Sequence, residues 1–396
     1  MLTSTYPRWA GDTEPAFVHA LCRKLATHFD IRVIAPHAPG AACSESLDGV
    51  QVFRFRYLPE RWETLAYGGG IPARLRLEPW RLVQVPCFVA GLLCAAWSAV
   101  RDHAADIIHA HWVIPQGLVA AIVRGGSRAP ALVCTAHGAD LFIGEGFLGR
   151  FLKRWALRRV QTLTVVSRAM VEPALALGVP KEAVEVASMG ADLETCFVPG
   201  DEARMPGRIL FAGRLVEKKG VNILLEAFAR VRTRRPELRL VIAGDGPERA
   251  RLQLRAAGLG IADDVEFAGA VPAEKLAALF RSSAMAVFPF IVAADGDREG
   301  FGLVVIEAQG CACPVIASDL PAVRDSIVDG ETGLLTPSGD AVALADRIDR
   351  LLEDTALAHR IALNGRRAAA ESFGWDAVAE RYCRILLDAR ARTRER

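Results

Sequence analysis

Short apolar segments rich in β-branched residues alternate with amphipathic segments through the first half of the chain. The amphipathic segments, such as 15–29 and 115–123, predict helices. The apolar segments predict strands at 31–35, 106–110, 131–135 and 162–166. Short apolar strands separated by helices are typical of a parallel sheet that is covered on both faces. The predicted fold class is therefore α/β.

The same alternation restarts after a turn-rich stretch at 198–207. Further strands are predicted at 208–213, 238–244, 265–269, 285–289 and 314–318. A last amphipathic helix is predicted at 375–387. Two successive series of strands and helices predict two doubly wound domains, with a boundary near 196–207.

The segment from Leu82 to Val100 contains no charged residue and is long enough to suggest a membrane span. Gln84, Pro86 and Ser98 dilute its apolar character, and a helix that starts after Pro86 is short for a bilayer. We therefore expect a buried core helix in this segment.

The first residues have neither a basic region nor an apolar stretch, so we expect no secretory signal. A doubly wound domain usually opens with a full strand, but only a few residues precede Tyr6 here. Either the first strand is short, or the reading frame starts upstream of Met1.

Composition narrows the class of protein. With 52% hydrophobic and 24% charged residues, disorder is excluded as the main state. A formal net charge of +2 argues against a protein that coats nucleic acid, and we expect no nucleic-acid partner. The nine cysteines form no Cys-x-x-Cys pair, which excludes a disulfide scaffold or zinc ribbon and suits a reducing cytoplasm.

Two carboxylates, Glu299 and Glu307, enclose the most informative segment. Glu299 lies in a glycine-rich loop that follows the predicted strand 285–289, and Glu307 lies on the helix after it. Ligands of open α/β folds bind at this edge of the sheet. The backbone N–H groups of Phe301, Gly302 and Leu303 are expected to point from the helix start toward an anion, and Glu307 can then reach a hydroxyl of the same ligand.

Two further strand ends carry polar loops. Arg214 and Lys219 follow the strand 208–213, and they offer the two cations that a diphosphate requires. Gly244 starts a turn after the strand 238–244, where glycine lets a ligand approach the backbone. Each loop alone could be a solvated turn, but three at successive strand ends indicate one binding site.

These loops resemble the C-terminal half of the retaining glycosyltransferases of family 4. The similarity rests on Gly213-Arg214 with Lys219-Gly220, Gly244-Asp-Gly-Pro247, Glu299 with Glu307, Pro314-Val-Ile-Ala-Ser318 and Asp329-Gly-Glu-Thr-Gly333. A looser similarity extends over the N-terminal half, at Gly11-Asp-Thr-Glu14, His109-Ala-His-Trp112, Thr135-Ala-His-Gly-Ala-Asp140, Val166-Ser167 and Met189-Gly-Ala-Asp192.

The resemblance implies the GT-B fold, in which two Rossmann-like doubly wound domains face each other across a cleft and the last helix crosses back onto the first domain. It divides the chain into an acceptor-binding domain at 1–197, a nucleotide-sugar-binding domain at 198–372 and a returning helix at 373–396. The implied activity is sugar transfer from a nucleotide diphosphate sugar with retention at the anomeric carbon, without a bound metal ion or other cofactor.

The resemblance also implies roles for the donor site. Arg214 and Lys219 would neutralise the leaving diphosphate, and Glu307 would accept hydrogen bonds from the ribose. Glu299 would face the donor sugar. The amides of Phe301, Gly302 and Leu303 would hold the sugar hydroxyls or the phosphate, and the base would pack near Val271.

His137 would lie beside the transferred sugar if the family pattern holds. The neighbouring Asp140, together with Gly11 and Asp12 of the first loop, would line the acceptor side. Many family members carry paired glycines in that loop, so Asp12 puts the acceptor geometry in question.

Two pairs of residues could be taken for metal ligands, but neither makes a convincing metal site. His109 and His111 lie on one face of a predicted strand, but no third ligand accompanies them. Asp295 and Asp297 match the metal-binding Asp-x-Asp of the other glycosyltransferase fold, in a chain that already supplies two cations for the diphosphate. We interpret them as a polar turn and expect no metal site.

The segment from Phe147 to Arg159 predicts a basic amphipathic helix. Phe147, Phe151 and Trp155 recur at helical spacing, and arginines and a lysine fill the other side. The helix either lies on an anionic membrane or packs its apolar side into the core. Six arginines crowd another region beside tryptophans and a tyrosine, at Arg54, Arg56, Arg61, Arg74, Arg76 and Arg81.

The leading interpretation is a cytoplasmic glycosyltransferase, peripheral on the inner face of the membrane, that extends a surface glycan or lipid-linked acceptor with a UDP- or GDP-linked sugar. The alternatives are a glycosyltransferase for a soluble small molecule, a non-catalytic sugar-nucleotide-binding protein, and an NAD(P)-dependent oxidoreductase. The last lacks a Gly-x-Gly-x-x-Gly after a first strand. The intact charged residues of the predicted donor site argue against the non-catalytic protein.

Overall fold

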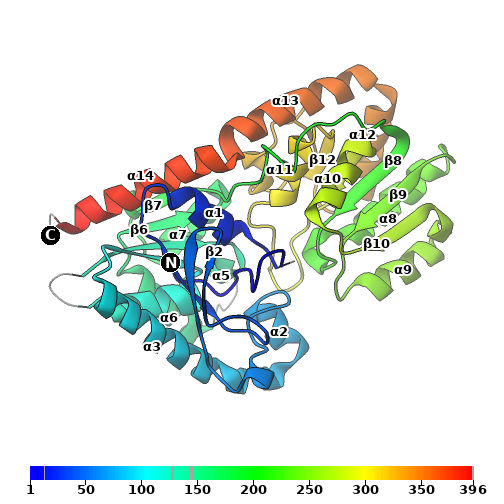
Figure 1. Cartoon of the computed structure of the whole chain (residues 1–396). Helices are drawn as coiled ribbons and strands as arrows, with labels where there is room; N and C mark the ends of the chain where they lie inside the picture. The colour runs from blue at the N-terminus through cyan, green and yellow to red at the C-terminus, as the bar shows by residue number, and fades with distance from the viewer. Residues whose placement is uncertain (13, 126–128, 143–145, 395–396) are drawn as a thin grey trace. The chain divides into compact units, whose positions relative to one another are not determined.

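A computed structural model describes the whole chain except residues 13, 126–128, 143–145 and 395–396 (Figure 1). The chain forms two compact units. The N-terminal unit contains Met1–Val166, Met170–Met189 and Val378–Arg396, and the C-terminal unit contains Ser167–Ala169 and Gly190–Ala377. The main division, after Met189, comes a few residues before the boundary expected at 197/198.

The N-terminal unit is built on a sheet whose strands are mostly parallel. Three strands follow the order β1-β3-β2 and four follow the order β4-β5-β6-β7. Leu2 forms bridges to both Ile34 of β1 and Ala110 of β4, so the expected first strand is reduced to a short contact between the two groups. The strands are β1 (Arg32–Pro36), β2 (Ser44–Leu47), β3 (Val50–Phe55), β4 (Ile107–His111), β5 (Ala131–Ala136), β6 (Thr162–Val165) and β7 (Val184–Val186).

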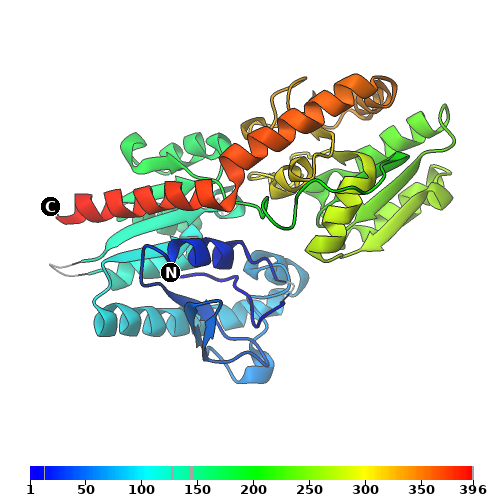
Figure 2. The same ribbon diagram turned by 45° about the horizontal axis from the view of Figure 1, so that its top comes forward.

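Helices cover this sheet (Figures 1 and 2). The helices of the unit are α1 (Phe17–Leu25), α2 (Ile71–Leu77), α3 (Val85–His103), α4 (Leu118–Val123), α5 (Ala139–Phe142), α6 (Phe147–Leu157) and α7 (Val171–Ala176). The last helix, α14 (Trp375–Arg394), begins in the C-terminal unit and continues into this one. Within the N-terminal unit, Tyr382 of α14 donates a buried hydrogen bond of 2.9 Å to the Ala187 carbonyl, and Arg390 pairs with Asp106.

The C-terminal unit contains one six-stranded parallel sheet with the order β10-β9-β8-β11-β12-β13. Its strands are β8 (Met205–Ala212), β9 (Arg239–Ala243), β10 (Val265–Gly269), β11 (Ser283–Phe288), β12 (Val315–Ser318) and β13 (Leu334–Thr336). Its helices are α8 (Val221–Arg232), α9 (Arg249–Gly258), α10 (Ala273–Ser282), α11 (Leu303–Gly310), α12 (Ala341–Glu353) and α13 (Thr355–Phe373). The strand order reverses between β8 and β11, which is where doubly wound folds bind ligands. The α/β prediction with two Rossmann-like units is confirmed.

The expectation of a buried core helix between Leu82 and Val100 is wrong. A 3-10 helix (Pro79–Gln84) leads into α3. The buried residues of α3 are Phe88, Leu92 and Ala96, and they pack on the sheet. Only 22% of its most apolar window is buried, although the helix from Pro79 to His103 is long and apolar enough to cross a membrane. The apolar residues of this helix therefore form an exposed face as well as the face that packs on the sheet.

The core-facing interpretation of the segment from Phe147 to Arg159 is also wrong. Phe147, Leu148 and Phe151 are exposed on α6, while Ala156 and Leu157 are buried. Lys153, expected on the solvated basic side, is buried and donates a 3.1 Å hydrogen bond to the Leu141 carbonyl. The helix contacts the unit through small and aliphatic groups and the lysine stem. Phe147 and Phe151 therefore face outward, whereas Trp155 is half-buried.

Two glycines allow the loops of the C-terminal sheet edge to pack closely. Gly220 has a φ of +64° at the start of α8, and a Cβ there would overlap the Pro289 carbonyl oxygen. Gly244 follows β9, and a Cβ there would overlap the Gly213 carbonyl oxygen. The loop after β8 is thus wedged between the loops after β11 and β9 with no room for side chains at these points.

Gly220→Ala is expected to destabilise the protein far more than Gly260→Ala. Both glycines have left-handed backbone conformations, with φ values of +64° and +71°, and an alanine in that conformation costs about 1 kcal/mol. Only at Gly220 does the new Cβ meet backbone, since nothing lies within 4 Å of it at Gly260. We expect a loss near 1 kcal/mol for Gly260→Ala and roughly 3 kcal/mol or more for Gly220→Ala in urea unfolding. Equal losses would contradict the close packing of these loops.

Candidate active site

The predicted donor residues gather at the carboxyl edge of the C-terminal sheet. Arg214 and Lys219 lie in the loop after β8, and Glu299 lies in the loop after β11. These two strands are hydrogen-bonded neighbours at the point where the strand order reverses. The topology therefore brings together two loops that are separated by about eighty residues in the sequence.

A salt bridge joins these two loops. Lys219 Nζ lies 2.6 Å from Glu299 Oε2, and the two side chains are only 13% and 12% exposed. The Lys219 ammonium also lies 4.6 Å from the centroid of the Phe290 ring, a cation–π contact. The pair therefore spans the sheet edge between β8 and β11.

The charges around Glu299 keep it ionised. Burial tends to raise the pKa of this carboxyl, but Lys219, Lys218 and a hydrogen bond from the Phe301 N–H together lower it to about 2. At neutral pH Glu299 is a carboxylate that can accept hydrogen bonds and stabilise positive charge. It cannot donate a proton as a general acid.

A second pair, which the sequence analysis missed, lies beside the first. Lys218 Nζ contacts Asp297 Oδ1 at 3.1 Å and the Arg298 carbonyl at 3.3 Å. Glu217 accepts a hydrogen bond of 3.1 Å from the Ala294 N–H. Glu217, Lys218 and Lys219 of the loop after β8 thus contact Ala294, Asp297 and Glu299 of the loop after β11. These contacts fix the position of Glu299.

The structure shows how the Asp-x-Asp turn at 295–297 is held. Asp297 is paired with Lys218, and Asp295 accepts a 3.0 Å hydrogen bond from the Asp297 N–H. The turn is a local structure that a lysine holds in place. Among the residues that the structure describes, no group of three His, Cys, Asp or Glu side chains could hold a metal ion.

The helix after this loop begins without a side-chain cap. Gly302, with φ +85°, is the residue before α11, and α11 starts at Leu303. The Phe301 N–H is directed to Glu299, and the Phe301 ring is buried 5.2 Å from Phe373. Of the three predicted anion-binding amides, the one of Phe301 therefore has an internal acceptor in this structure.

Glu307 lies on α11, half-buried. Burial raises its pKa to about 7, although the charge of Lys219 acts in the opposite direction. Lys219 thus lowers the pKa of both Glu299 and Glu307, but it forms a salt bridge with Glu299. Glu307 is a carboxyl group that a suitable ligand could recruit into its ionised form.

The remaining donor-site residues lie on the neighbouring loops. Gly213 donates a hydrogen bond to the Ala243 carbonyl at 2.9 Å, and Gly244 donates one to the Gly269 carbonyl at 2.7 Å. The loops after β8, β9 and β10 are therefore in sequence along one edge. Val271 is half-buried just beyond β10, where the resemblance places the base.

The N-terminal unit holds His137 at the end of β5. His137 Nε2 lies 3.0 Å from His111 Nδ1, and the rings of Trp112 and Phe17 lie 4.6 and 5.2 Å away. Burial lowers the pKa of His137 to about 3, so this imidazole is neutral at physiological pH. His111, the partner, was considered above only as a member of a metal pair.

His109 and His111 do lie together, but each has another partner. Their ring centroids are 4.4 Å apart on β4. His109 Nε2 lies 2.7 Å from the Thr135 hydroxyl, and its ring stacks on Tyr382. Burial lowers the pKa of His109 to about 3 and that of His111 as well. The three histidines form a neutral group at the ends of β4 and β5, in which His109 and His111 are buried and His137 is half-buried.

Asp140 ties two loops of the N-terminal unit together. Its carboxylate accepts hydrogen bonds of 3.0 Å each from the N–H groups of His137, Gly138 and Val113. Burial raises the pKa of Asp140, and these hydrogen bonds oppose that effect. Its side chain positions the backbone that carries His137.

Asp12 has a similar local role in the first loop. Arg8 forms two side-chain hydrogen bonds with it, at 2.8 and 2.6 Å, and donates a third from its backbone N–H. Burial raises the pKa of Asp12, and the bonds from Arg8 outweigh it and bring the pKa to about 2. Gly11, with φ +78°, makes the turn, and Thr13 lies outside the described residues.

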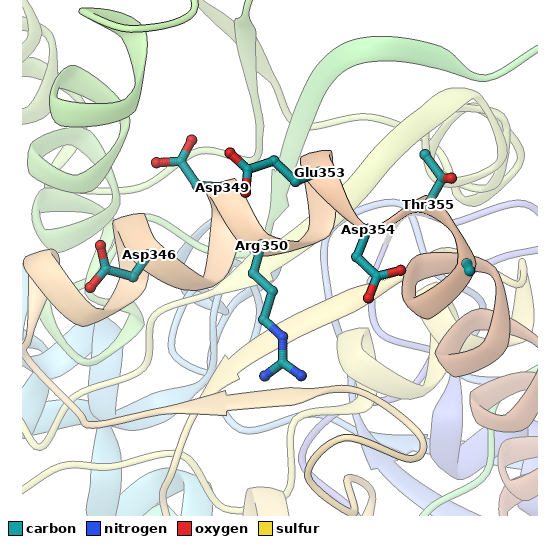
Figure 3. Close-up of a pocket in the computed structure, with 7 residues that line it drawn as sticks. Asp346, Asp349, Arg350, Glu353, Asp354 and Thr355 are labelled. Carbon is teal, nitrogen blue, oxygen red and sulfur yellow. The ribbon is translucent and has the colours of Figure 1, made fainter.

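A hollow of about 470 Å³ on the C-terminal unit offers a contrast to this site. It is lined by Asp346, Asp349, Arg350, Glu353 and Asp354 of α12 and the turn after it (Figure 3). The carboxylates do not converge: Asp349 and Glu353 point to one side of α12 and Arg350 to the other. Asp349 pairs with Arg234 and Arg235, and Asp354 caps α13, so the acids serve the fold.

Comparison with known families covers both units. The family of "Glycosyl transferases group 1" matches residues 199–368, and the "Glycosyl transferase 4-like domain" matches residues 15–190. One similar relative is the GDP-mannose-dependent alpha-(1-6)-phosphatidylinositol monomannoside mannosyltransferase of Mycolicibacterium smegmatis. It is 30% identical over 66% of this chain and 71% of its own length.

Solved structures agree with the two-unit architecture. Sucrose-phosphate synthase from Thermosynechococcus elongatus has a TM-score of 0.76 at 24% identity and covers 95% of this chain and 93% of its own. Anabaena HepE in complex with UDP-glucose has a TM-score of 0.72 at 19% identity and covers 98% of both chains. With its GT-B fold and both halves of the family matched, the chain belongs to the group 1 glycosyltransferases.

Proposed function

We propose that this glycosyltransferase transfers a sugar, with retention at the anomeric carbon, from a UDP- or GDP-linked donor to a glycan or lipid-linked acceptor. The observation that carries the proposal is the Lys219–Glu299 pair at the reversal point of the sheet, with Glu307 under the influence of the same lysine. The relatives support a nucleotide sugar donor, since one is named as GDP-mannose-dependent and one structure holds UDP-glucose.

The charges of the proposed donor site suit a diphosphate leaving group. Negative charge develops on the diphosphate as the sugar bond breaks, and a fixed cation lowers the barrier by stabilising that charge. Lys219 is held in place by Glu299 and the Phe290 ring, so it needs little reorganisation. Arg214, the second residue after β8, supplies the second cation with a planar set of donors.

Glu299 is proposed to face the donor sugar. With its pKa lowered to about 2, it remains charged throughout the physiological range and can accept hydrogen bonds from sugar hydroxyls. The amides of Gly302 and Leu303, at the uncapped start of α11, are proposed to bind the sugar or phosphate oxygens. The Phe301 N–H would join them only when it leaves its acceptor Glu299. Gly244 allows the backbone to approach the ligand, and Val271 packs on the base.

Glu307 is proposed to accept the two ribose hydroxyl hydrogen bonds. A carboxylate with a pKa of about 7 is poorly solvated in the ligand-free protein. Two hydroxyl donors would replace the missing water and favour the ionised form. The ionised form of Glu307 would thus be modestly destabilised in the ligand-free protein, and donor binding would remove that destabilisation.

The N-terminal unit is proposed to supply the acceptor side. His137 is neutral, and its bond to His111 fixes the ring, so it can exchange a hydrogen bond with a sugar hydroxyl without carrying charge. Asp140 positions His137, and the loop of Gly11 and Asp12 would border the acceptor. Family resemblance, and not geometry, assigns these acceptor contacts.

We further propose a cytoplasmic enzyme that is peripheral on the inner membrane face. Support comes from α6, whose Phe147, Leu148 and Phe151 are exposed beside exposed Arg150 and Arg154. The phosphatidylinositol substrate in the name of the Mycolicibacterium relative is consistent with a lipid-linked acceptor.

The direct test is to incubate the protein with a panel of nucleotide sugars that includes UDP-glucose and GDP-mannose. A true donor should raise the melting temperature, because it binds the folded state alone. Transfer of the radiolabelled sugar should follow with a suitable acceptor, and the anomeric configuration of the product is read by NMR. Stabilisation without any transfer or hydrolysis would favour the non-catalytic binding protein.

Arg214→Ala and Lys219→Ala are each expected to slow transfer by about 10²–10³, because each removes a preorganised cation from the diphosphate. Steady-state turnover of the radiolabelled donor measures the effect. Lys275→Ala, at an exposed position of α10, is the matched control and should retain full activity. Near-normal turnover in both site variants would remove the assignment.

Transfer is expected to continue in excess EDTA. The two cations of the loop after β8 take the place of a metal ion at the diphosphate, and Asp297 is already paired with Lys218. Initial rates with and without chelator, at equal ionic strength, decide the point. Loss of activity that manganese or magnesium restores would make Asp295 and Asp297 metal ligands after all.

Glu307→Gln is expected to stabilise the ligand-free protein at pH 8 and to weaken donor binding. The pKa of Glu307 is raised in the folded state, so the loss of stability grows as the pH rises from the unfolded pKa near 4.5 to the folded pKa of about 7, and it is fully present above pH 7. The gain should be about 3 kcal/mol at pH 8 and close to zero at pH 4.5 in urea unfolding. An exposed control, Glu331→Gln, should show neither effect. A gain that does not depend on pH would contradict the titration of Glu307.

A further inference from the structure

The helix α3 has two faces with different environments. Its inner face is anchored to the sheet: the Phe88 ring lies 5.2 Å from the rings of both Phe55 and Tyr57. Gly91 brings the helix so close to β3 that a Cβ there would lie 2.9 Å from the Arg56 carbonyl oxygen. The helix is therefore part of the folded unit and lies along its surface in both views (Figures 1 and 2).

The opposite face of α3 is apolar and exposed. We call it the outer stripe, and it consists of Leu82, Val83, Pro86, Cys87, Ala90, Cys94 and Trp97. Val83 is 73% exposed and Trp97 is 55% exposed. No charged residue occurs between Arg81 and Arg101, a length of roughly 28 Å of helix. The solvent side of a surface helix normally carries charged residues, so this stripe has the character of a contact face.

The outer stripe continues onto neighbouring helices. The short helix α4 contacts both α3 and α6, so the three helices are neighbours. Each adds exposed apolar side chains: Ile122 on α4, and Phe147 and Phe151 on α6. A patch that extends over three adjacent helices is larger than the scattered apolar residues of an ordinary soluble surface.

Aromatic and basic side chains border this patch. Trp62 and Trp80 are exposed near the start of α3, and the guanidinium groups of Arg61 and Arg81 lie 5.1 and 4.9 Å from their rings. On α6, exposed arginines follow the exposed aromatics. Two acids lie at this border: Glu78 is paired with Arg81, and Glu60 accepts a hydrogen bond from the Gly40 N–H. An apolar face bordered by tryptophan and arginine is complementary to the interface of an anionic bilayer, where hydrocarbon meets phosphate.

We propose that the outer stripe is a membrane-contact face, on which α3 lies parallel to the bilayer surface with Val83 and Trp97 in the interfacial layer. A span is excluded by the inner face, because Phe88, Leu92 and Ala96 are packed on the sheet and cannot also face lipid. The arginines of α6 supply electrostatic attraction, and α3 supplies apolar contact that salt does not screen. This proposal rests on the peripheral membrane location proposed above and names the surface that makes the contact. It is independent of the sugar chemistry, because the surface contains none of the proposed donor residues.

The chain carries its own probes for this contact. Cys87 and Cys94 lie on the outer stripe, and Cys43 is exposed elsewhere in the same unit. Vesicles that contain anionic lipid should protect Cys87 and Cys94 from a water-soluble maleimide several-fold, while Cys43 continues to react. Mass spectrometry of the labelled peptides compares the three sites in one sample.

Substitutions then separate apolar from electrostatic contact. Val83→Ser with Trp97→Ser should weaken vesicle partition by about tenfold or more, since both groups lose transfer from water. The matched control, Leu254→Ser with Val342→Ser, changes exposed apolar residues of the C-terminal unit and should bind normally. Binding that remains at 1 M NaCl, where the screening length is about 3 Å, should depend on the outer stripe and not on Arg150, Arg154 and Arg158.

Several outcomes would overturn the proposal. Unchanged vesicle partition in the Val83 and Trp97 variant, with the same melting temperature as the parent, would show that the stripe does not touch lipid. Equal labelling of all three cysteines with and without vesicles would show the same. If the parent dimerises without lipid and the variant is monomeric in sedimentation velocity, the stripe is instead an interface between two copies. A failure in the nucleotide-sugar assays would leave this result unchanged, so the two proposals fail separately.

Discussion

The ion pair between Lys219 and Glu299 is the contact on which the geometry of the candidate site depends. It joins the loops after β8 and β11, two strands that are neighbours in the sheet and distant in the sequence. Removing two charges from water is costly, and a mostly buried pair is retained only where its geometry compensates that cost. Here the ammonium also meets the Phe290 ring, and the carboxylate accepts the Phe301 N–H, so both ions are well satisfied.

The same lysine sets two carboxyl groups to different states. Glu299, in direct contact with it, has its pKa held at about 2, whereas Glu307 is more distant and has its pKa raised by burial to about 7. Two carboxyl groups at opposite ends of one short segment thus differ in charge because of their surroundings alone. A permanent carboxylate suits a sugar contact, and a group that ionises when hydroxyl donors arrive suits a ribose contact.

The polar residues near the sheet edge of the N-terminal unit differ from those of the donor site in charge and in role. The unit's histidines near the sheet edge are neutral, with His109 and His111 buried and His137 half-buried. Asp140 and Asp12 accept hydrogen bonds that hold loops in place. The two cations of the candidate site, Arg214 and Lys219, therefore belong to the C-terminal unit, where the diphosphate is proposed to bind. The outer helices of the N-terminal unit combine apolar exposure with arginines, a composition that fits contact with lipid better than contact with water.

The positions of the strands could be predicted from the sequence, but the partners of individual side chains could not. Periodicity located the strands, and with them the edge that carries Arg214, Lys219, Glu299 and Glu307, because a parallel sheet places every strand end of one kind on the same side. The sequence also contained Lys218 and Asp297, but nothing local distinguishes them from a solvated charge pair. Their partnership exists only because β8 and β11 are adjacent, and adjacency is a property of topology. The bond between His137 and His111 has the same origin, in the neighbouring positions of β4 and β5.

The sequence by itself determined the α/β class, the two units, and the residue types available at each strand end, because these follow from local periodicity and turn chemistry. Only the tertiary structure decided which face of a helix is buried. The segment from Leu82 to Val100 is apolar all round, and periodicity cannot say which apolar side meets the sheet. Packing against Phe55 and Tyr57 selected the side with Phe88, and the remainder of the helix was left exposed. Burial depends on what the rest of the chain places nearby, and no local pattern contains that information.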